Sequence, residues 1–468
     1  LFGPPQRLFL VLFATLPFGS FAVVPSQLIG GFTFTAGPIL ALLIVGRMAL
    51  SPGGVSYALT AAFRPNRLML LFLLLVIACV TTLFMPRLLA RSIEVIPFRA
   101  ADLSVTVPLR PTPQNISQLI YLVISIFTVL AAAFFLRAPG MRQHVLTAIC
   151  MGAAMTVTTG LVDFVSQYLP LGAVLAPFRT ATYALAVDVN VLGGKRVVGL
   201  MPEASAFGGL CLSFLTALVF FRFAIADRWL RERAVPLLIV ALIVMIWLAK
   251  STSAYAGLGV VGVLAAVHWL VHAGGAAGRG RSARSLSTEF WAAFTAIMGF
   301  FLIMLALPAL LDPLFAIIDR MVLSKAASSS FEERGLWRST AWQAFTGSGL
   351  LGVGAGATRA SSSIVGMFAA VGLAGALAYY AFLLQTALRR AAPGDKEGAI
   401  IVGGFGWFII PDLVVGFFVG SPDFGIFNAV IFGLVTAVGL SRRPNPQVSP
   451  AYGTLDVTGS MPARSPPA

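Results

Sequence analysis

Long apolar stretches separated by short polar segments run through most of the chain. About 20 consecutive apolar residues are enough for a helix that crosses the roughly 30 Å hydrocarbon core of a bilayer. We count about twelve such stretches and predict one transmembrane helix for each. Their approximate bounds are 8–24, 34–50, 68–85, 117–136, 145–169, 204–224, 234–249, 252–272, 290–311, 364–388, 399–420 and 425–440.

The composition supports this interpretation. Apolar residues make up 58% of the chain and charged residues only 10%, and the mean hydropathy is +0.92. A soluble globular domain carries about 25% charged residues, so this chain has too little polar surface to cover itself in water. We therefore predict an all-α polytopic membrane protein in which residues 1–440 form one helical bundle. The proline-rich residues 441–468 are predicted to be a disordered cytoplasmic tail.

The first apolar stretch shares some features with a signal peptide, because Arg7 precedes it and small residues near Ala22 loosely imitate a cleavage site. The apolar run continues through Val24, however, and no soluble domain follows it. We therefore predict that this stretch is retained as a helix.

The basic residues indicate an orientation, because short cytoplasmic loops of membrane proteins are enriched in Lys and Arg. The arginines between the apolar stretches are best explained if both termini lie in the cytoplasm. Three longer segments then lie on the outer side, at 86–116, 170–203 and 312–363. Loops of this length are usually functional or disordered, so they are where we look for a site.

The third outer segment contains the pattern of a short amphipathic helix. Ser330 and Glu333 have the spacing of a capping box. We predict a helix over 331–346 that ends at Gly347.

The net charge is +15, from 32 Lys and Arg against 17 Asp and Glu. These cations are scattered between the apolar stretches, which is typical of residues that orient a membrane protein and contact anionic lipid headgroups. The sequence has no basic helix with interleaved aromatic residues, so we predict no nucleic-acid partner. The three cysteines fall inside apolar stretches without the spacing of a metal site, and we predict neither a metal nor a cofactor.

A cationic motif stands just before the apolar stretch at 204–224, where Lys195 and Arg196 follow two glycines. A helix N-terminus presents free N–H groups and a partial positive charge, so this junction is a candidate anion site. The alternative is that both cations contact only outer-leaflet phosphates. Glu203, at the expected first turn, either stabilises the helix dipole or accepts a proton from a hydroxyl nucleophile.

A second cationic motif lies on the predicted helix of the third outer segment. Arg334 and Arg338 are four residues apart and hence on one face. Two tryptophans stand beside Arg338 and no acid follows within the next turn, which leaves its guanidinium available to an external anion. The glycine-rich stretch 347–356 then leads to Arg359 and would allow a ligand to approach the backbone closely, although it is not a Walker loop. The alternative is a solvated loop whose charges pair with one another.

Two acids, Asp163 and Asp412, lie inside predicted spans. An ionised acid at the bilayer centre costs about 2.5–3.5 kcal/mol, so each should have a partner or a water-filled pocket. We expect Asp163 near the outer end of its helix and Asp412 deep in the membrane. Such acids are typical of proton-coupled transporters, which keeps a transport function open.

Six further motifs follow one another in order between about residues 140 and 440. They are Lys195-Arg196-Val-Val-Gly199-Leu-Met-Pro-Glu203-Ala-Ser205-Ala-Phe-Gly208, Lys250-Ser251-Thr-Ser253-Ala-Tyr255, Arg334-Gly-Leu-Trp337, Gly349-Leu-Leu-Gly352-Val-Gly354-Ala-Gly356, Ser361-Ser-Ser363 and Gly372-Leu-Ala-Gly375. In this order the chain resembles the O-antigen ligase and polymerase superfamily, and especially its exopolysaccharide polymerases.

The resemblance implies a glycosyltransferase of the bacterial inner membrane with a large periplasmic loop. It implies transfer of a glycan from an undecaprenyl-diphosphate donor to an acceptor hydroxyl, without an obligatory metal. Periplasmic arginines of the family hold the diphosphate, which assigns catalytic roles to Arg196 and Arg338, with Glu203 as a proton acceptor. Substrate binding is expected from Arg179, Lys195, Lys250, Arg334 and Arg359.

The same resemblance favours a polymerase over a ligase. Ligases have a histidine after the glycine-rich stretch, where this chain has Ser361, Ser362 and Ser363. The expected partners are the lipid-linked glycan donor and acceptor, membrane lipids, a flippase and a chain-length regulator. A ligase and a transporter remain alternatives. A transporter often has paired broken helices at the midplane, and the sequence offers only the one candidate at Pro411.

Overall fold

A computed structural model gives the fold of the chain. It describes residues 3–24, 33–98, 104–170, 172–181, 185–191, 194–273, 329–420 and 423–440. The predicted span 290–311, part of the third outer segment and the tail 441–468 lie outside the described residues.

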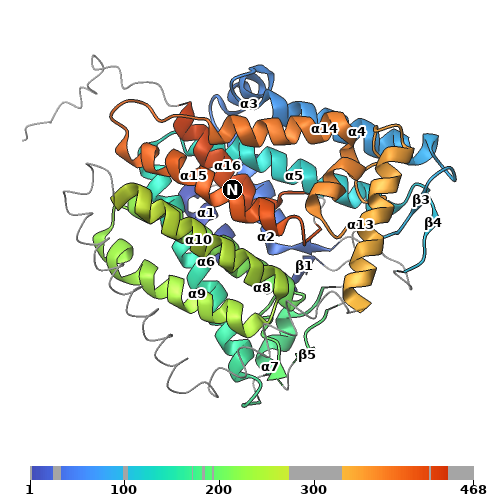
Figure 1. The fold of residues 1–468 in the computed structure, drawn as a ribbon. Helices are drawn as coiled ribbons and strands as arrows, with labels where there is room; N and C mark the ends of the chain where they lie inside the picture. Colours follow the sequence, from blue (N-terminus) through green and yellow to red (C-terminus); the bar gives the residue numbers. More distant parts are fainter. Residues whose placement is uncertain are drawn as a thin grey trace, which may run out of the picture.

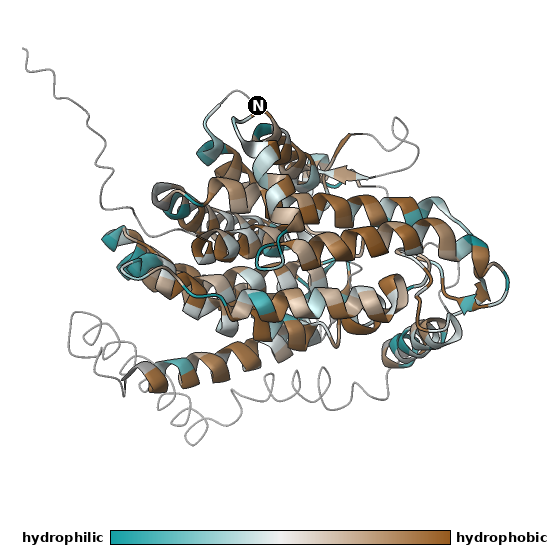
Figure 2. Ribbon diagram, turned by 90° about the horizontal axis from the view of Figure 1, so that it is seen from above, coloured by the Kyte–Doolittle hydropathy of each residue, from teal (hydrophilic) through white to brown (hydrophobic). Residues whose placement is uncertain are grey.

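Eight helices of the described part are long and apolar enough to cross a membrane. Each coincides with a stretch predicted from the sequence, so the chain is a mostly helical, multi-pass membrane protein. The helices lie side by side (Figure 1), and their middle portions are predominantly hydrophobic (Figure 2). They are α4 (Met69–Leu88), α5 (Pro113–Phe135), α6 (Pro139–Val165), α8 (Ala204–Phe221), α9 (Val235–Ala249), α10 (Thr252–Ala273), α14 (Ser363–Ala387) and α15 (Lys396–Val415), with the short helical segments η3 (Arg222–Ala224) and η4 (Leu230–Ala234) extending α8 and α9.

The predicted span 34–50 is one half of a bent pair. Helix α2 (Ala36–Ala49) and helix α3 (Gly54–Phe63) meet at an angle of 102°. Between them Gly53 has a φ of 74°, which glycine adopts without steric cost. Counting this pair as one broken span raises the number of candidates to nine in the described part of the chain.

The predicted span 8–24 is wrong as a continuous helix, because α1 (Pro5–Thr15) ends early. Pro17 disfavours helical geometry at the residue before it and cannot donate a backbone hydrogen bond. The chain then forms strand β1 (Ala22–Val24), which pairs antiparallel with β2 (Phe34–Thr35). Eleven helical residues rise about 16 Å, too little to cross a bilayer core.

The last predicted span is also short. Helix α16 (Gly425–Gly439) has 15 residues, and every side chain from Phe427 to Val438 is buried. A Cβ at Gly433 would lie 2.4 Å from the Cβ of Ala132, so glycine lets α16 approach α5 closely. The helix is held inside the bundle by α5. The predicted total of twelve spans is therefore not reached among the described residues.

The irregular elements collect at one end of the bundle, toward the right in Figure 1. They come from the three segments that the sequence assigned to the outer side. They are β3 (Glu94–Val95) paired with β4 (Val107–Pro108), α7 (Gly172–Leu175), the 3₁₀ turn η2 (Ala176–Phe178), β5 (Asn190–Val191) paired with β6 (Gly194–Lys195), and α13 (Ser329–Gly347).

The predicted cytoplasmic loops meet at the opposite end. Arg142 at the start of α6 forms a 2.6 Å ion pair with Asp395 before α15. Arg389 after α14 donates a 2.7 Å hydrogen bond to the carbonyl of Arg67 before α4. Segments that the charge pattern placed on one side of the membrane therefore share one end of the bundle.

The glycine-rich stretch 347–356 packs against protein backbone. Helix α14 is broken at Gly372, where φ is 70° and ψ is −173°. The N–H groups of Val353 and Gly354 donate to the carbonyls of Ala369 and Ala370, at 2.7 and 3.0 Å, just before this break. The sequence suggested that a ligand could approach the backbone of this stretch closely. In the structure α14 occupies that position.

We expect Gly352→Ala to destabilise the protein by about 1–3 kcal/mol, because Gly352 has a φ of 83° and an added Cβ would lie 2.5 Å from the backbone nitrogen of Gly372. Thermal unfolding of the purified protein measures the change. Gly403→Ala is the matched control, since its added Cβ meets no atom within 4 Å. Equal stability of the two variants would contradict this packing.

The arrangement of the two ends predicts opposite accessibility for Ser339 on α13 and Arg228 between α8 and α9, both exposed. In a background that lacks the half-buried Cys79, we expect a membrane-impermeant thiol reagent to modify Ser339→Cys only from outside the cell. The same reagent should reach Arg228→Cys only from the cytoplasm. Labelling of both positions from one side would rule out the arrangement.

Candidate functional site

A buried carboxylate organises the outer end of α6. Asp163 is fully buried, and its Oδ2 accepts hydrogen bonds from the backbone N–H groups of Val198 and Gly199, at 2.7 and 3.1 Å. Its Oδ1 pairs with the Arg179 guanidinium at 2.9 Å and lies 4.0 Å from the Lys195 Nζ. The prediction that Asp163 requires a partner is confirmed.

Arg179 and Lys195 are therefore both engaged within the protein. Arg179 also donates a 3.1 Å hydrogen bond to the carbonyl of Gly199, and Lys195 forms a second ion pair with Asp188 at 3.0 Å. Both side chains hold the loop 194–200 against α6. The sequence did not reveal this role because the partners are separated along the chain.

Lys250 at the end of α9 and Arg196 within the loop 194–200 join the two segments. Lys250 has a left-handed backbone, with φ 47°, and its Nζ donates a 3.1 Å hydrogen bond to the carbonyl of Gly194. Arg196 Nε donates a 3.1 Å hydrogen bond to the carbonyl of Ala249. Burial lowers the pKa of the Lys250 ammonium, and the nearby Arg196 lowers it further.

Three arginines from distant parts of the chain come close enough to interact electrostatically. Burial lowers the pKa of Arg196, Glu203 opposes that shift, and Arg334 adds to it. Burial likewise lowers the pKa of Arg359, with Glu203 again opposing and Arg334 again adding. We call Arg196, Arg334 and Arg359 the arginine cluster. Glu203 is the carboxylate that both buried members share.

The arginine cluster is held in place by aromatic and backbone contacts. The guanidinium of Arg359 lies over the ring of Trp337, 4.1 Å from its centroid. Arg334 donates a 3.4 Å hydrogen bond to the carbonyl of Phe418 after α15, and its own carbonyl accepts a 2.6 Å hydrogen bond from Ser361. These contacts join α13, α14 and α15 around the cluster.

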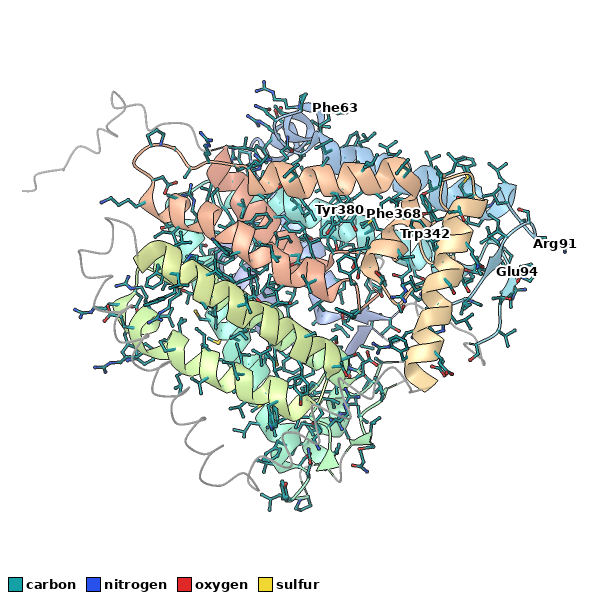
Figure 3. The ribbon with its side chains drawn as sticks, in the orientation of Figure 1. Phe63, Arg91, Glu94, Trp342, Phe368 and Tyr380 are labelled. Atoms are coloured by element: carbon teal, nitrogen blue, oxygen red, sulfur yellow. The ribbon has the colours of Figure 1, made fainter. Side chains whose placement is uncertain are left out.

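Helix α13 starts earlier than predicted. It includes Ser330, so Ser330 does not occupy the N-cap position of a capping box, and the actual N-cap lies outside the described residues. The helix packs its buried Ala341 and Phe345 against α14. Trp342 lies beside Phe345 and Phe368, and the labelled side chains of Trp342, Phe368 and Tyr380 form a row from α13 to α14 (Figure 3).

Arg338 is exposed on α13, one turn after Arg334. Among the described residues its guanidinium makes no hydrogen bond or ion pair. Of the eight predicted site residues, Arg338 and Glu203 are exposed, and Arg338 lies beside the arginine cluster rather than within it.

Glu203 occupies the N-cap position of α8, with an extended backbone at φ −155°. Its side chain makes no capping hydrogen bond to the backbone; it accepts one from the Ser205 hydroxyl instead. Glu203 therefore lies at the start of α8, as the capping interpretation expected. Its carboxylate, however, is oriented by the Ser205 hydroxyl rather than by backbone N–H groups.

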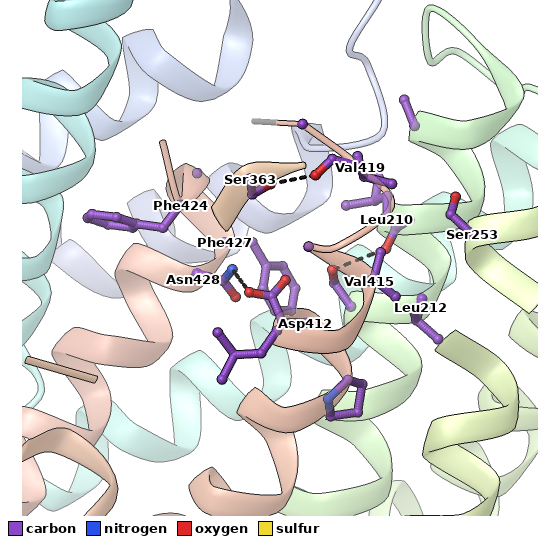
Figure 4. A pocket seen from close by; sticks show the side chains of 18 of the residues that line it. Leu210, Leu212, Ser253, Ser363, Asp412, Val415, Val419, Phe424, Phe427 and Asn428 are labelled. Atoms are coloured by element: carbon purple, nitrogen blue, oxygen red, sulfur yellow. Dashed lines mark hydrogen bonds between the residues drawn. The ribbon is translucent and has the colours of Figure 1, made fainter. Parts of the chain in front are cut away.

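Glu203 and Ser205 also line a cavity of about 550 Å³ within the bundle, shown in Figure 4. The side chain of Asp412 is exposed although it lies among helices, because it opens into this cavity, and Asn428 donates to it at 3.3 Å. Asp412 falls in the last turn of α15. Further hydrogen-bonding and aromatic side chains of the lining are Ser213, Thr216, Ser253, Ser363, Tyr379, Tyr380, Phe408, Phe424 and Phe427.

The site is thus an arginine cluster joined through Glu203 to a cavity with hydroxyl, carboxylate and aromatic groups. In the described part of the chain no group of three or more His, Cys, Asp or Glu side chains could hold a metal ion. No protein-family model matches this chain, and no curated protein or solved structure matches it either.

The buried ion pair at Asp163 predicts a structural role for Arg179. We expect Arg179→Ala to destabilise the protein by up to about 3–5 kcal/mol, because the buried carboxylate loses its nearer cation and keeps only Lys195, at 4.0 Å. Thermal unfolding and abundance in the membrane measure this loss. Asp163→Asn in the same chain should restore part of the stability, since the unpaired charge is removed. Normal stability of Arg179→Ala alone would show that the pair contributes nothing.

Proposed function

We propose that this protein polymerises undecaprenyl-diphosphate-linked oligosaccharides into exopolysaccharide or O-antigen at the periplasmic face of the bacterial inner membrane. The observation that carries the proposal is the arginine cluster at one end of a membrane bundle, adjoining a polar cavity through Glu203. The motifs that resemble the polymerase family supply two of its arginines and Glu203.

The arginine cluster suits a lipid diphosphate leaving group. Transfer breaks the bond between the anomeric carbon and the diphosphate oxygen, and negative charge develops on that oxygen. Fixed guanidinium donors stabilise this charge more in the transition state than in the ground state, which lowers the barrier. Arginine is suited to this work because its planar fork can contact two phosphate oxygens at once.

Glu203 is the best candidate for receiving the proton of the acceptor hydroxyl. It lies between the cluster and the cavity, and the Ser205 hydroxyl fixes its orientation. The hydroxyl oxygen forms the new glycosidic bond while its proton passes to the carboxylate. Orientation of the two substrates contributes more to such a transfer than the strength of the base.

Arg338 has a different place in this proposal. Its exposed guanidinium, one turn from Arg334, is positioned for a diphosphate that arrives from the membrane surface. Arg179, Lys195 and Lys250 support the loop that carries Arg196, since each is engaged with a carboxylate or carbonyl.

The serines after the glycine-rich stretch favour a polymerase over a ligase. Their hydroxyls donate to the carbonyls of Arg334, Gly416 and Val419, so they fix the start of α14. They provide no base at the position where ligases have a histidine. A flippase and a chain-length regulator remain expected partners on the basis of the family resemblance.

Removing one guanidinium of the cluster should lower polymerisation at least about tenfold, because a charged hydrogen bond is worth roughly 1.5–3 kcal/mol. We expect this loss for Arg196→Ala, Arg334→Ala and Arg359→Ala. We also expect it for Arg338→Ala, beside the cluster. Arg338→Lys should remain impaired if the contact is bidentate. The measurement is the glycan polymer formed at matched protein abundance in the membrane.

The matched control for these variants is Arg87→Ala. Arg87 is exposed, and its hydrogen bond goes to a carbonyl of its own helix. Near-normal polymer from all four alanine variants of the site would mean that the diphosphate binds elsewhere, and the assignment would be withdrawn.

A further inference from the structure

A second cavity, of about 730 Å³, lies next to the first at the same end of the bundle. Five polar side chains of α5 line it at intervals of one to four residues, which places them on one face of the helix. They are Gln114, Ser117, Gln118, Tyr121 and Ser125. Eleven residues separate the first from the last, a rise of about 17 Å along the helix.

The two cavities share a wall. Met201, Leu210, Asp423, Gly425 and Phe427 line both of them. Asp423 accepts a 3.1 Å hydrogen bond from the Ser125 hydroxyl and another of 3.1 Å from the N–H of Gly425. A ligand in the second cavity would therefore lie beside a ligand in the first.

The lining of the second cavity has a distinct chemistry. Among its described residues Asp423 is the only charged one, and no cation is present to hold a diphosphate. The other polar groups are amides and hydroxyls, and the aromatic rings are those of Phe18, Phe98, Tyr121 and Phe427. The rest of the lining is mostly aliphatic and includes Leu16, Ile124 and Leu210. Amides and hydroxyls both donate and accept hydrogen bonds, and aromatic faces stack on the apolar faces of sugar rings. This set fits a neutral polyhydroxylated ligand.

Of the five polar side chains of α5 that line the cavity, those of Gln114 and Gln118 are available to such a ligand. Tyr121 donates to the carbonyl of Thr33 at 2.6 Å, and Ser117 donates to the carbonyl of Pro113 at 3.1 Å. Within the described part of the chain, the side-chain amides of Gln114 and Gln118 make no hydrogen bond. Both amides are half-buried in the first turns of α5, so a ligand in the cavity can form hydrogen bonds with them.

We propose that the second cavity binds the glycan of the acceptor strand, made of neutral sugar residues, through Gln114 and Gln118. This inference rests on the proposed polymerase function, because it separates the acceptor glycan from the diphosphate held by the arginine cluster. The shared wall brings the end of the acceptor next to the cavity that Glu203 lines.

The test uses the full chain in lipid nanodiscs, with Gln118→Cys in a background that lacks Cys79. The probe is the neutral oligosaccharide released by mild acid from the lipid-linked repeat unit of the native host. A charged, water-soluble thiol reagent should modify Gln118→Cys, and the oligosaccharide should slow this reaction. Undecaprenyl diphosphate alone should leave the reaction unchanged.

Two further variants sharpen the measurement. Ile116→Cys is the control, because Ile116 lies on the opposite face of α5, and the oligosaccharide should not alter its labelling. Adding Gln114→Ala to the Gln118→Cys chain should raise the half-protecting oligosaccharide concentration about fivefold, the effect of one lost hydrogen bond. Ser117→Cys provides a second labelled position if Gln118→Cys does not fold.

The outcomes separate this inference from the proposed function. Absence of labelling, or protection by undecaprenyl diphosphate rather than by the oligosaccharide, would overturn the glycan site. If the native chain polymerises lipid-linked repeats but the oligosaccharide does not slow the labelling of Gln118→Cys, the glycan site would be overturned and the polymerase function would stand. Protection together with a chain that fails to polymerise lipid-linked repeats would support the glycan site and overturn the proposed function.

Discussion

Irregular backbone at the membrane edge survives only where its polar groups find partners inside the protein, and Asp163 provides them for the loop 194–200. One buried carboxylate accepts two backbone N–H groups and forms an ion pair with Arg179, so helix α6, the segment that carries Arg179 and the loop become one unit. Arg196 lies within this fixed loop, and Glu203 follows it. Their positions therefore depend on an interaction in which neither takes part.

A second fixed unit brings the other arginines to the same place. The glycine-rich stretch 347–356 fits against the break of α14 at Gly372, and the backbone N–H of Arg359 donates to the carbonyl of Ile96 at 2.7 Å. Ser361 ties the end of this unit to Arg334. The two units converge, and three like charges come together near the carboxylates of Glu203 and Glu333. The surrounding packing holds these like charges close together despite their repulsion. A bound anion would relieve that repulsion.

Much of the membrane framework could be predicted from the sequence, because a long run of apolar residues reports directly on lipid contact. The early end of α1 and the bend between α2 and α3 were missed, since a hydropathy average does not register Pro17 or Gly53. Site roles were harder to predict. Arg179 and Arg359 are the same residue type in similar loops, yet Asp163 binds one and Trp337 covers the other. That difference arises only from tertiary partners.

The charges of the cluster favour the proposed group transfer over transport. Burial lowers the pKa of Arg196 and Arg359, but arginine titrates so far above neutrality that both guanidinium groups stay charged at neutral pH. Their field is therefore present before substrate arrives and cannot be switched off by a proton. A transporter has to release its cargo, which a fixed positive field opposes for an anion. An enzyme benefits from the same field, because the charge that it stabilises appears only as the bond to the diphosphate breaks.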